Sequence, residues 1–162
     1  MAKERYYAAY GSNLSLEQMA YRCPQAKMVG TGILEHYELQ FRGSAGRAHA
    51  TVEPCAGKEV PILLWSLNDR DEQSLDRYEG YPSYYKKTIC PIVVNDTVYE
   101  AMLYEMQPGH ALNIPSPQYF QTIRDGYEMF DFPLELLEKA LMKSVMPLYE
   151  KPEAAQEMDM NL

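Results

Sequence analysis

The 162-residue chain has few of the side chains that form metal sites and nucleophilic dyads, with only three cysteines and three histidines. Cys23, Cys55 and Cys90 lie far apart, with no C-x-x-C pair and no Cys/His ligand spacing, which argues against a zinc site. No serine has a G-x-S-x-G setting, and nothing indicates a Cys/His nucleophile pair. We therefore expect no metal site.

The chain is also short of positive charge. It has 15 Lys and Arg against 23 Asp and Glu, a formal net charge of −8. Phosphate contacts need clustered basic residues, so nucleic acid and anionic membrane surfaces are not expected partners. No apolar run reaches membrane-spanning length, and MAKERYY at the N-terminus has no apolar signal core. With scattered free cysteines, this predicts a cytoplasmic protein.

The residues that are present predict a single α+β domain over residues 1–150 and a polar, mobile tail over 151–162. The strands are too closely spaced for repeated βαβ units. About six strands would hide their edges by closing into a small barrel, although the pattern alone does not prove closure. Strands are predicted at 5–10, 27–42, 49–54, 60–67, 84–94 and 98–106, and helices at 15–22, 69–78, 117–130 and 134–149.

The stretch YYAAYGSNLSLEQM (6–19) places a Gly-Ser-Asn loop between a predicted strand and a predicted helix. Ser15 and Gln18 have the spacing of a capping box at the start of that helix. Backbone N–H groups at a helix start can hold a carboxylate in such a loop. From the loop alone, an ordinary strand-to-helix turn is the favoured interpretation.

A second candidate site element is SLDRYEGYPSYY (74–85), where Glu79 ends a predicted helix. The helix C-terminus and burial among the neighbouring tyrosines would both raise the pKa of this carboxyl group. A carboxylate with a pKa near neutrality is a competent general base. The alternative is a solvated glutamate at a helix end. The histidines are expected to be structural or exposed rather than catalytic: His36, His49 and His110.

Three motifs occur together in the order found in one known family: YGSNL (10–14), LDRYEG (75–80) and PSPQY (115–119). The chain thereby resembles the γ-glutamylcyclotransferase-like proteins over about residues 5–135. The resemblance implies a small mixed β-barrel with flanking helices and a cavity at one end. It also implies conversion of a γ-glutamyl-amino acid or γ-glutamyl-amine to 5-oxoproline and a free amine. The substrate's own α-amine is the nucleophile, so the reaction requires no triad, metal or cofactor.

The resemblance also implies roles for individual residues. Glu79 would be the catalytic acid/base. A loop-based cradle and several tyrosines would bind the γ-glutamyl substrate, namely Tyr7, Tyr10, Gly11, Ser12, Asn13, Tyr85, Tyr104 and Tyr119. Residues 43–49 and 107–115 are predicted to form the rim that selects the leaving group.

Two other functions are compatible with the same residues. The chain could be a non-catalytic binding module for γ-glutamyl compounds, which would have no need of a base at Glu79. It could also be an interaction protein that uses the barrel as a scaffold, which would leave the Gly11–Asn13 loop and Tyr119 without a role. We rank the enzyme first. The leaving group and the oligomeric state, monomer or homodimer, stay open.

Overall fold

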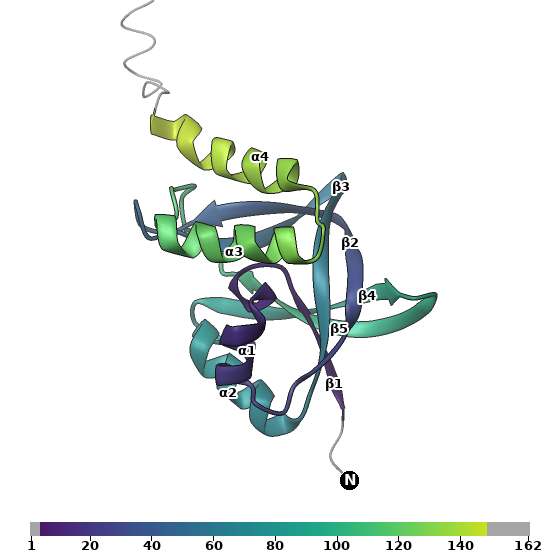
Figure 1. The fold of residues 1–162 in the computed structure, drawn as a ribbon. Coiled ribbons are helices and arrows are strands. Elements are labelled where there is room, and N and C mark those ends of the chain that lie inside the picture. The colour runs from purple at the N-terminus through teal and green to yellow at the C-terminus, as the bar shows by residue number, and fades with distance from the viewer. Residues whose placement is uncertain (1–3, 149–162) are drawn as a thin grey trace, which may run out of the picture.

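The computed structural model describes residues 4–148, so the predicted tail at 151–162 lies outside the described residues. Within that range five strands close into one barrel in the order β1-β3-β2-β4-β5, and β5 pairs in parallel with β1 (Figure 1). The predicted α+β barrel is confirmed. The strands are β1 (Arg5–Ala9), β2 (Lys27–Arg42), β3 (His49–Leu67), β4 (Tyr85–Val94) and β5 (Thr97–Met106).

The expected count of about six strands was wrong because the predicted strands 49–54 and 60–67 are one strand, β3. This strand pairs with β2 on both sides of residues 55–58. Residues 55–59 were left outside both predicted strands. In the structure residues 56–59 are exposed at the edge of the ribbon, where polar side chains are compatible with a strand.

Gly30 and Gly32 are the positions at which the sequence predicts a bend or bulge in the strand over 27–42, and strand β2 is irregular there. The pairing register with β3 shifts between Met28 and Gly30. A Cβ on Gly32 would lie 2.8 Å from the backbone oxygen of Val93, so β2 and β4 approach closely here. Only glycine permits this separation, and it closes the barrel at the β2–β4 pair.

The helices lie on one side of the barrel, α1 beside α2 and α3 beside α4 (Figure 1). The predicted cap Ser15 accepts a backbone N–H at the start of α1. Ser116, which the sequence also favours as an N-cap because it precedes Pro117, does the same for α3. Asp69 and Glu72 have the spacing of a capping pair in the sequence, but the cap of α2 is Asn68, whose side chain accepts the N–H of Asp71 at 2.8 Å. The helices are α1 (Leu16–Arg22), α2 (Asp69–Glu79), α3 (Pro117–Met129) and α4 (Leu134–Val145), with 3-10 turns η1 (Ser12–Leu14) and η2 (Met146–Leu148).

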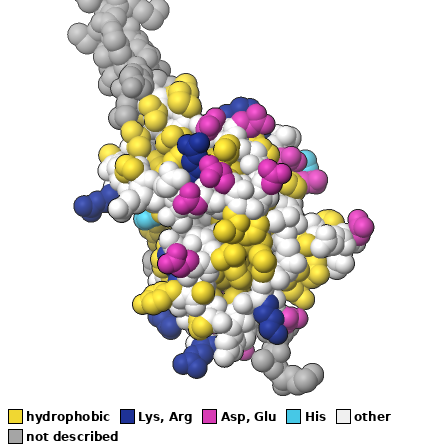
Figure 2. All heavy atoms as spheres, in the orientation of Figure 1, with side chains coloured by type: hydrophobic (Ala, Val, Ile, Leu, Met, Phe, Trp, Pro, Cys, Tyr) yellow, Lys and Arg dark blue, Asp and Glu magenta, His cyan; other side chains and the backbone are white. Residues whose placement is uncertain are grey.

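The outer surface of the barrel carries hydrophobic side chains. Ile33, Val93 and Val98 are exposed, and Val93 pairs with both of the others across neighbouring strands. Figure 2 shows one face of the molecule, on which hydrophobic side chains gather with acidic residues around them. No helix within residues 4–148 has the length and apolar character needed to cross a bilayer.

Candidate active site

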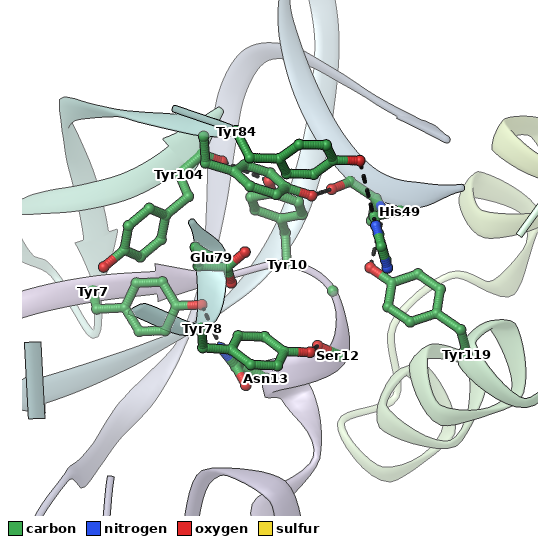
Figure 3. A pocket seen from close by; sticks show the side chains of 13 residues that line it. Tyr7, Tyr10, Ser12, Asn13, His49, Tyr78, Glu79, Tyr84, Tyr104 and Tyr119 are labelled. Atoms are coloured by element: carbon green, nitrogen blue, oxygen red, sulfur yellow. Dashed lines mark hydrogen bonds between the residues drawn. The ribbon is translucent and has the colours of Figure 1, made fainter. Parts of the chain in front are cut away.

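One pocket of about 170 Å³ contains every site residue predicted from the sequence (Figure 3). Strand β1 and the loop after it, the end of α2, strands β4 and β5 and the start of α3 all contribute to its wall. The lining residues are Tyr7, Tyr10, Gly11, Ser12, Asn13, Glu79, Tyr85, Tyr104 and Tyr119, together with His49, Ala50, Tyr78 and Tyr84.

The loop after β1 forms a 3-10 turn rather than leading directly into α1. The N–H of Leu14 donates to the oxygen of Gly11 at 3.0 Å, and Leu14 is fully buried against α3. This anchor holds Ser12 and Asn13 at the pocket, where both are buried. In the hydrogen bonds of the described residues, the N–H groups of residues 11–13 are not used. They stay available to a ligand.

Arg22, the last residue of α1, holds the loop from behind. Its Nη1 donates to Oδ1 of Asn13, and Nδ2 of Asn13 donates to the hydroxyl of Tyr7 at 2.9 Å. The guanidinium also lies over the ring of Tyr78, 3.5 Å from the centroid. Arg22 thereby connects the loop to the end of α2.

Glu79 is the last residue of α2, and Gly80 ends the helix in the left-handed conformation at φ 66°. Figure 3 shows its carboxylate in the middle of the labelled side chains. Burial raises the pKa of Glu79 from its ordinary value of 4.5 to about 7, and the positive charge of Arg22 opposes the shift. The direction is the predicted one. At neutral pH the carboxyl group can therefore both accept and release a proton.

Four tyrosine hydroxyls around Glu79 have defined partners. Two donate to backbone oxygens, Tyr10 to that of Tyr104 at 2.5 Å and Tyr85 to that of Ala50 at 2.7 Å. Tyr104 donates to Oδ1 of Asp76 at 2.7 Å. Tyr119 instead accepts the N–H of Ala50 at 2.9 Å. Burial raises the pKa of all four phenols, so they are protonated at neutral pH.

The family model described as "Gamma-glutamyl cyclotransferase, AIG2-like" matches residues 7–129, well over half of the chain and the whole span that contributes the pocket. The chain belongs to this family. It is therefore an enzyme of the γ-glutamylcyclotransferase type, as the motifs indicated. The match takes in all nine predicted site residues of the pocket.

Individual relatives agree with the family assignment. Human gamma-glutamylcyclotransferase is 32% identical over 155 residues, which cover 87% of this chain and 78% of the human one. The bovine gamma-glutamylcyclotransferase is 29% identical over 164 residues, or 94% of this chain and 85% of the bovine one. A solved structure of a gamma-glutamyl cyclotransferase superposes with a TM-score of 0.76 at 28% identity, covering 85% of this chain and 86% of that chain.

For this cyclotransferase family member, sequence reasoning missed part of the pocket wall. His49 was expected to be structural or exposed; it is exposed, and it also lines the pocket. Its Nδ1 lies 3.4 Å from the hydroxyl of Tyr84, and its ring is 5.1 Å from that of Tyr119. Burial lowers the pKa of His49. The ring of Tyr84 also lies 4.9 Å from that of His110. Both histidines fall in the segments predicted as the rim, which was the available signal.

Arg22 and Ala50 were also missed, and no motif position marks either residue. Arg22 reaches the pocket only through Asn13 and Tyr78, and Ala50 takes part through its backbone. Among the described residues, no group of three or more His, Cys, Asp and Glu side chains is arranged to hold a metal ion.

Proposed function

We propose that this enzyme converts a γ-glutamyl-amino acid or γ-glutamyl-amine to 5-oxoproline and a free amine, with Glu79 as the acid/base. One observation carries the proposal: a carboxyl group with a pKa of about 7 lies in the same pocket as unused backbone N–H groups. The first can move a proton, and the second can hold a carboxylate. A pure binding module would need only the second.

The loop would bind the glutamyl end of the substrate. The N–H groups of residues 11–13, with the side chains of Ser12 and Asn13, would receive the α-carboxylate. Fixing that end makes the flexible glutamyl chain fold so that its amine meets its own γ-carbonyl carbon. Such positioning can lower the barrier by about 7–11 kcal/mol.

Glu79 would relay protons from the attacking amine to the leaving amine. Its carboxylate removes a proton from the substrate's α-ammonium, and the freed amine attacks the γ-carbonyl to form a new C–N bond. The tetrahedral intermediate then collapses as the original γ-amide C–N bond breaks. Protonated Glu79 gives its proton to the leaving nitrogen. The regenerated carboxylate then passes the second proton of the attacking nitrogen to the released amine, which departs as an ammonium ion, so the enzyme ends as it began. No redox partner or water molecule is consumed.

We also propose a cytoplasmic location, because all three cysteines are free. Cys23 and Cys90 are buried, and the thiol of Cys90 forms a hydrogen bond with the hydroxyl of Tyr37.

The proposed reaction is tested directly by incubating the purified full-length protein with a panel of γ-glutamyl-amino acids, γ-glutamyl-amines and glutathione. We expect 5-oxoproline and the free amine to appear in equal amounts for at least one compound. Chromatographic quantification of both products checks this. Release of free glutamate instead would indicate hydrolysis and would reject the proposed cyclisation.

Arg22→Met is expected to reduce kcat/KM by about 10- to 100-fold, because Asn13 loses the donor that orients its amide. Removing the positive charge should also move the acidic limb of the pH–rate profile to higher pH, since Arg22 lowers the pKa of Glu79. Steady-state rates between pH 5 and 9 measure both effects. Arg77→Met is the control, since Arg77 is exposed on α2 and its hydrogen bond is to Ser74. An unchanged profile in Arg22→Met would contradict this role.

A further inference from the structure

The pocket tyrosines differ in what they can offer a ligand. A phenol has one proton to donate and lone pairs that accept. A hydroxyl that already donates its proton to a fixed acceptor can only accept from a ligand. One that receives an N–H still has its proton to donate. The partners of each hydroxyl therefore determine its polarity toward the substrate.

The backbone of Ala50 determines whether two of these hydroxyls donate or accept. Its backbone oxygen accepts the proton of Tyr85 at 2.7 Å, and its N–H donates to the oxygen of Tyr119 at 2.9 Å. A backbone oxygen cannot donate and an N–H cannot accept, so neither assignment can be reversed. Tyr85 is therefore an acceptor toward the pocket and Tyr119 a donor. Both bond to one residue, which sets the two hydroxyls close together.

The other tyrosines extend this pattern. Tyr10 donates to a backbone oxygen at 2.5 Å, and Tyr104 donates to Asp76, which also lies 2.8 Å from Nζ of Lys87. Both are acceptors toward the pocket, like Tyr85. Tyr7 receives the N–H of Asn13 at 2.9 Å, and Arg22 fixes that amide by donating to its oxygen. Tyr7 therefore keeps its proton and lies beside the loop.

We propose that Tyr85 and Tyr119 distinguish the two reacting groups of the substrate. Tyr85 accepts from the α-ammonium before Glu79 deprotonates it. Tyr119 donates to the γ-carbonyl oxygen and stabilises the negative charge that develops there. The cyclisation needs the amine and the carbonyl carbon about 3–3.5 Å apart. Adjacent acceptor and donor hydroxyls match that arrangement. This assignment rests on the proposed function for the identity of the substrate.

The charges and hydrogen-bonding groups around the pocket are consistent with this arrangement. Glu79 is the carboxylate of the pocket lining, and Arg22, behind the loop, is the positively charged group that favours its ionisation. The other titratable groups in the wall are tyrosines, which come from all around the pocket, and His49 from β3. A cationic substrate amine can therefore bind to a carboxylate and to acceptor hydroxyls. The substrate's oxygens can accept from Tyr119, Tyr7 and the loop N–H groups.

The test compares two ligands that differ only in the α-amino group, γ-glutamylglycine and glutarylglycine. Their affinities are measured by calorimetry on protein carrying Glu79→Gln, so that turnover is blocked. Adding Tyr85→Phe should weaken the binding of γ-glutamylglycine by about 10-fold or more, because this ligand has an ammonium group. It should weaken the binding of glutarylglycine, which has none, by less than about twofold. Adding Tyr119→Phe should weaken both ligands by the same factor.

Rates give a second readout in protein with Glu79 intact. Tyr119→Phe should lower kcat by about 10²–10³-fold with little change in KM, as expected for loss of a donor to a developing oxyanion. Tyr85→Phe should act mainly through KM. Tyr21→Phe, on a side chain that is 91% exposed, is the matched control and should change nothing. Near-UV circular dichroism confirms that the rings stay packed.

The outcomes separate this inference from the proposed function. Equal weakening of both ligands by Tyr85→Phe would overturn it, as would discrimination between the ligands by Tyr119→Phe or an unchanged kcat in Tyr119→Phe. A complete lack of ligand binding would overturn it too. If the protein releases no 5-oxoproline but the binding differences appear, the proposed reaction fails while the assignment of the two tyrosines stands.

Discussion

Replacing Glu79 by glutamine is expected to lower the rate of 5-oxoproline release by about 10³-fold. Glutamine keeps the size of the side chain and its place at the end of α2. Its amide cannot take the proton from the attacking ammonium and return it to the leaving amine. The loop, Arg22 and the tyrosines stay in place, so substrate affinity should change far less than kcat. Product quantification under saturating substrate measures the effect.

A stability measurement shows whether the loss of activity reflects chemistry or misfolding. The pKa of Glu79 is about 7 in the folded protein and near 4.5 when unfolded. Between these values the unfolded carboxyl is ionised and the folded one protonated, so the free energy of unfolding falls as pH rises. Above pH 7 the full penalty applies, on the order of 3 kcal/mol. Glu79→Gln lacks this penalty.

Glu79→Gln should therefore be more stable than the parent protein at pH 8 and nearly equal to it at pH 4. Thermal unfolding at the two pH values checks this. Glu138→Gln, on the exposed face of α4, is the control and should keep full activity and unchanged stability. Full activity in Glu79→Gln would refute Glu79 as the acid/base. An inactive variant that is also less stable at pH 8 would show that the fold was damaged.

The second large effect is the pH dependence of the unmodified enzyme. If Glu79 must be ionised in the free enzyme, kcat/KM should fall about tenfold for each pH unit below about 7, reaching about 100-fold at pH 5. The direction follows from burial, which raises the pKa and leaves the carboxyl group protonated in weak acid. The substrate's own amine must arrive as an ammonium ion, so the rate should also fall at high pH.

Rates from pH 4.5 to 9.5 with one substrate from the panel define both limbs. Titration of the Glu79 carboxyl carbon by NMR, in ligand-free protein labelled at glutamate, supplies the pKa without turnover. The two values should agree. A rate profile that stays flat down to pH 4.5 would contradict a requirement for ionised Glu79.

The sequence predicted well those parts of the fold that depend on local interactions, such as the ends of helices. Ser15 and Ser116 accept N–H groups three residues ahead, and Gly80 ends α2 in the left-handed conformation. Each depends on neighbours within a few residues. Strand β3 was divided in two because the exposure of residues 56–59 depends on the partner strand β2, which a linear pattern does not reveal.

The same distinction applies to the site. The three motifs indicated the family because each is short and continuous, and they contain six of the nine predicted residues that meet in one pocket. The other three, Tyr7, Tyr85 and Tyr104, came from the wider resemblance. Only the tertiary structure decided what those residues can do. The pKa of Glu79 is raised by burial under segments remote in sequence.

The polarity of the tyrosines is likewise set by distant partners, 94 residues away for Tyr10, 35 for Tyr85 and 69 for Tyr119. A hydroxyl donates or accepts according to which backbone atom it meets. These contacts form only when the barrel has closed.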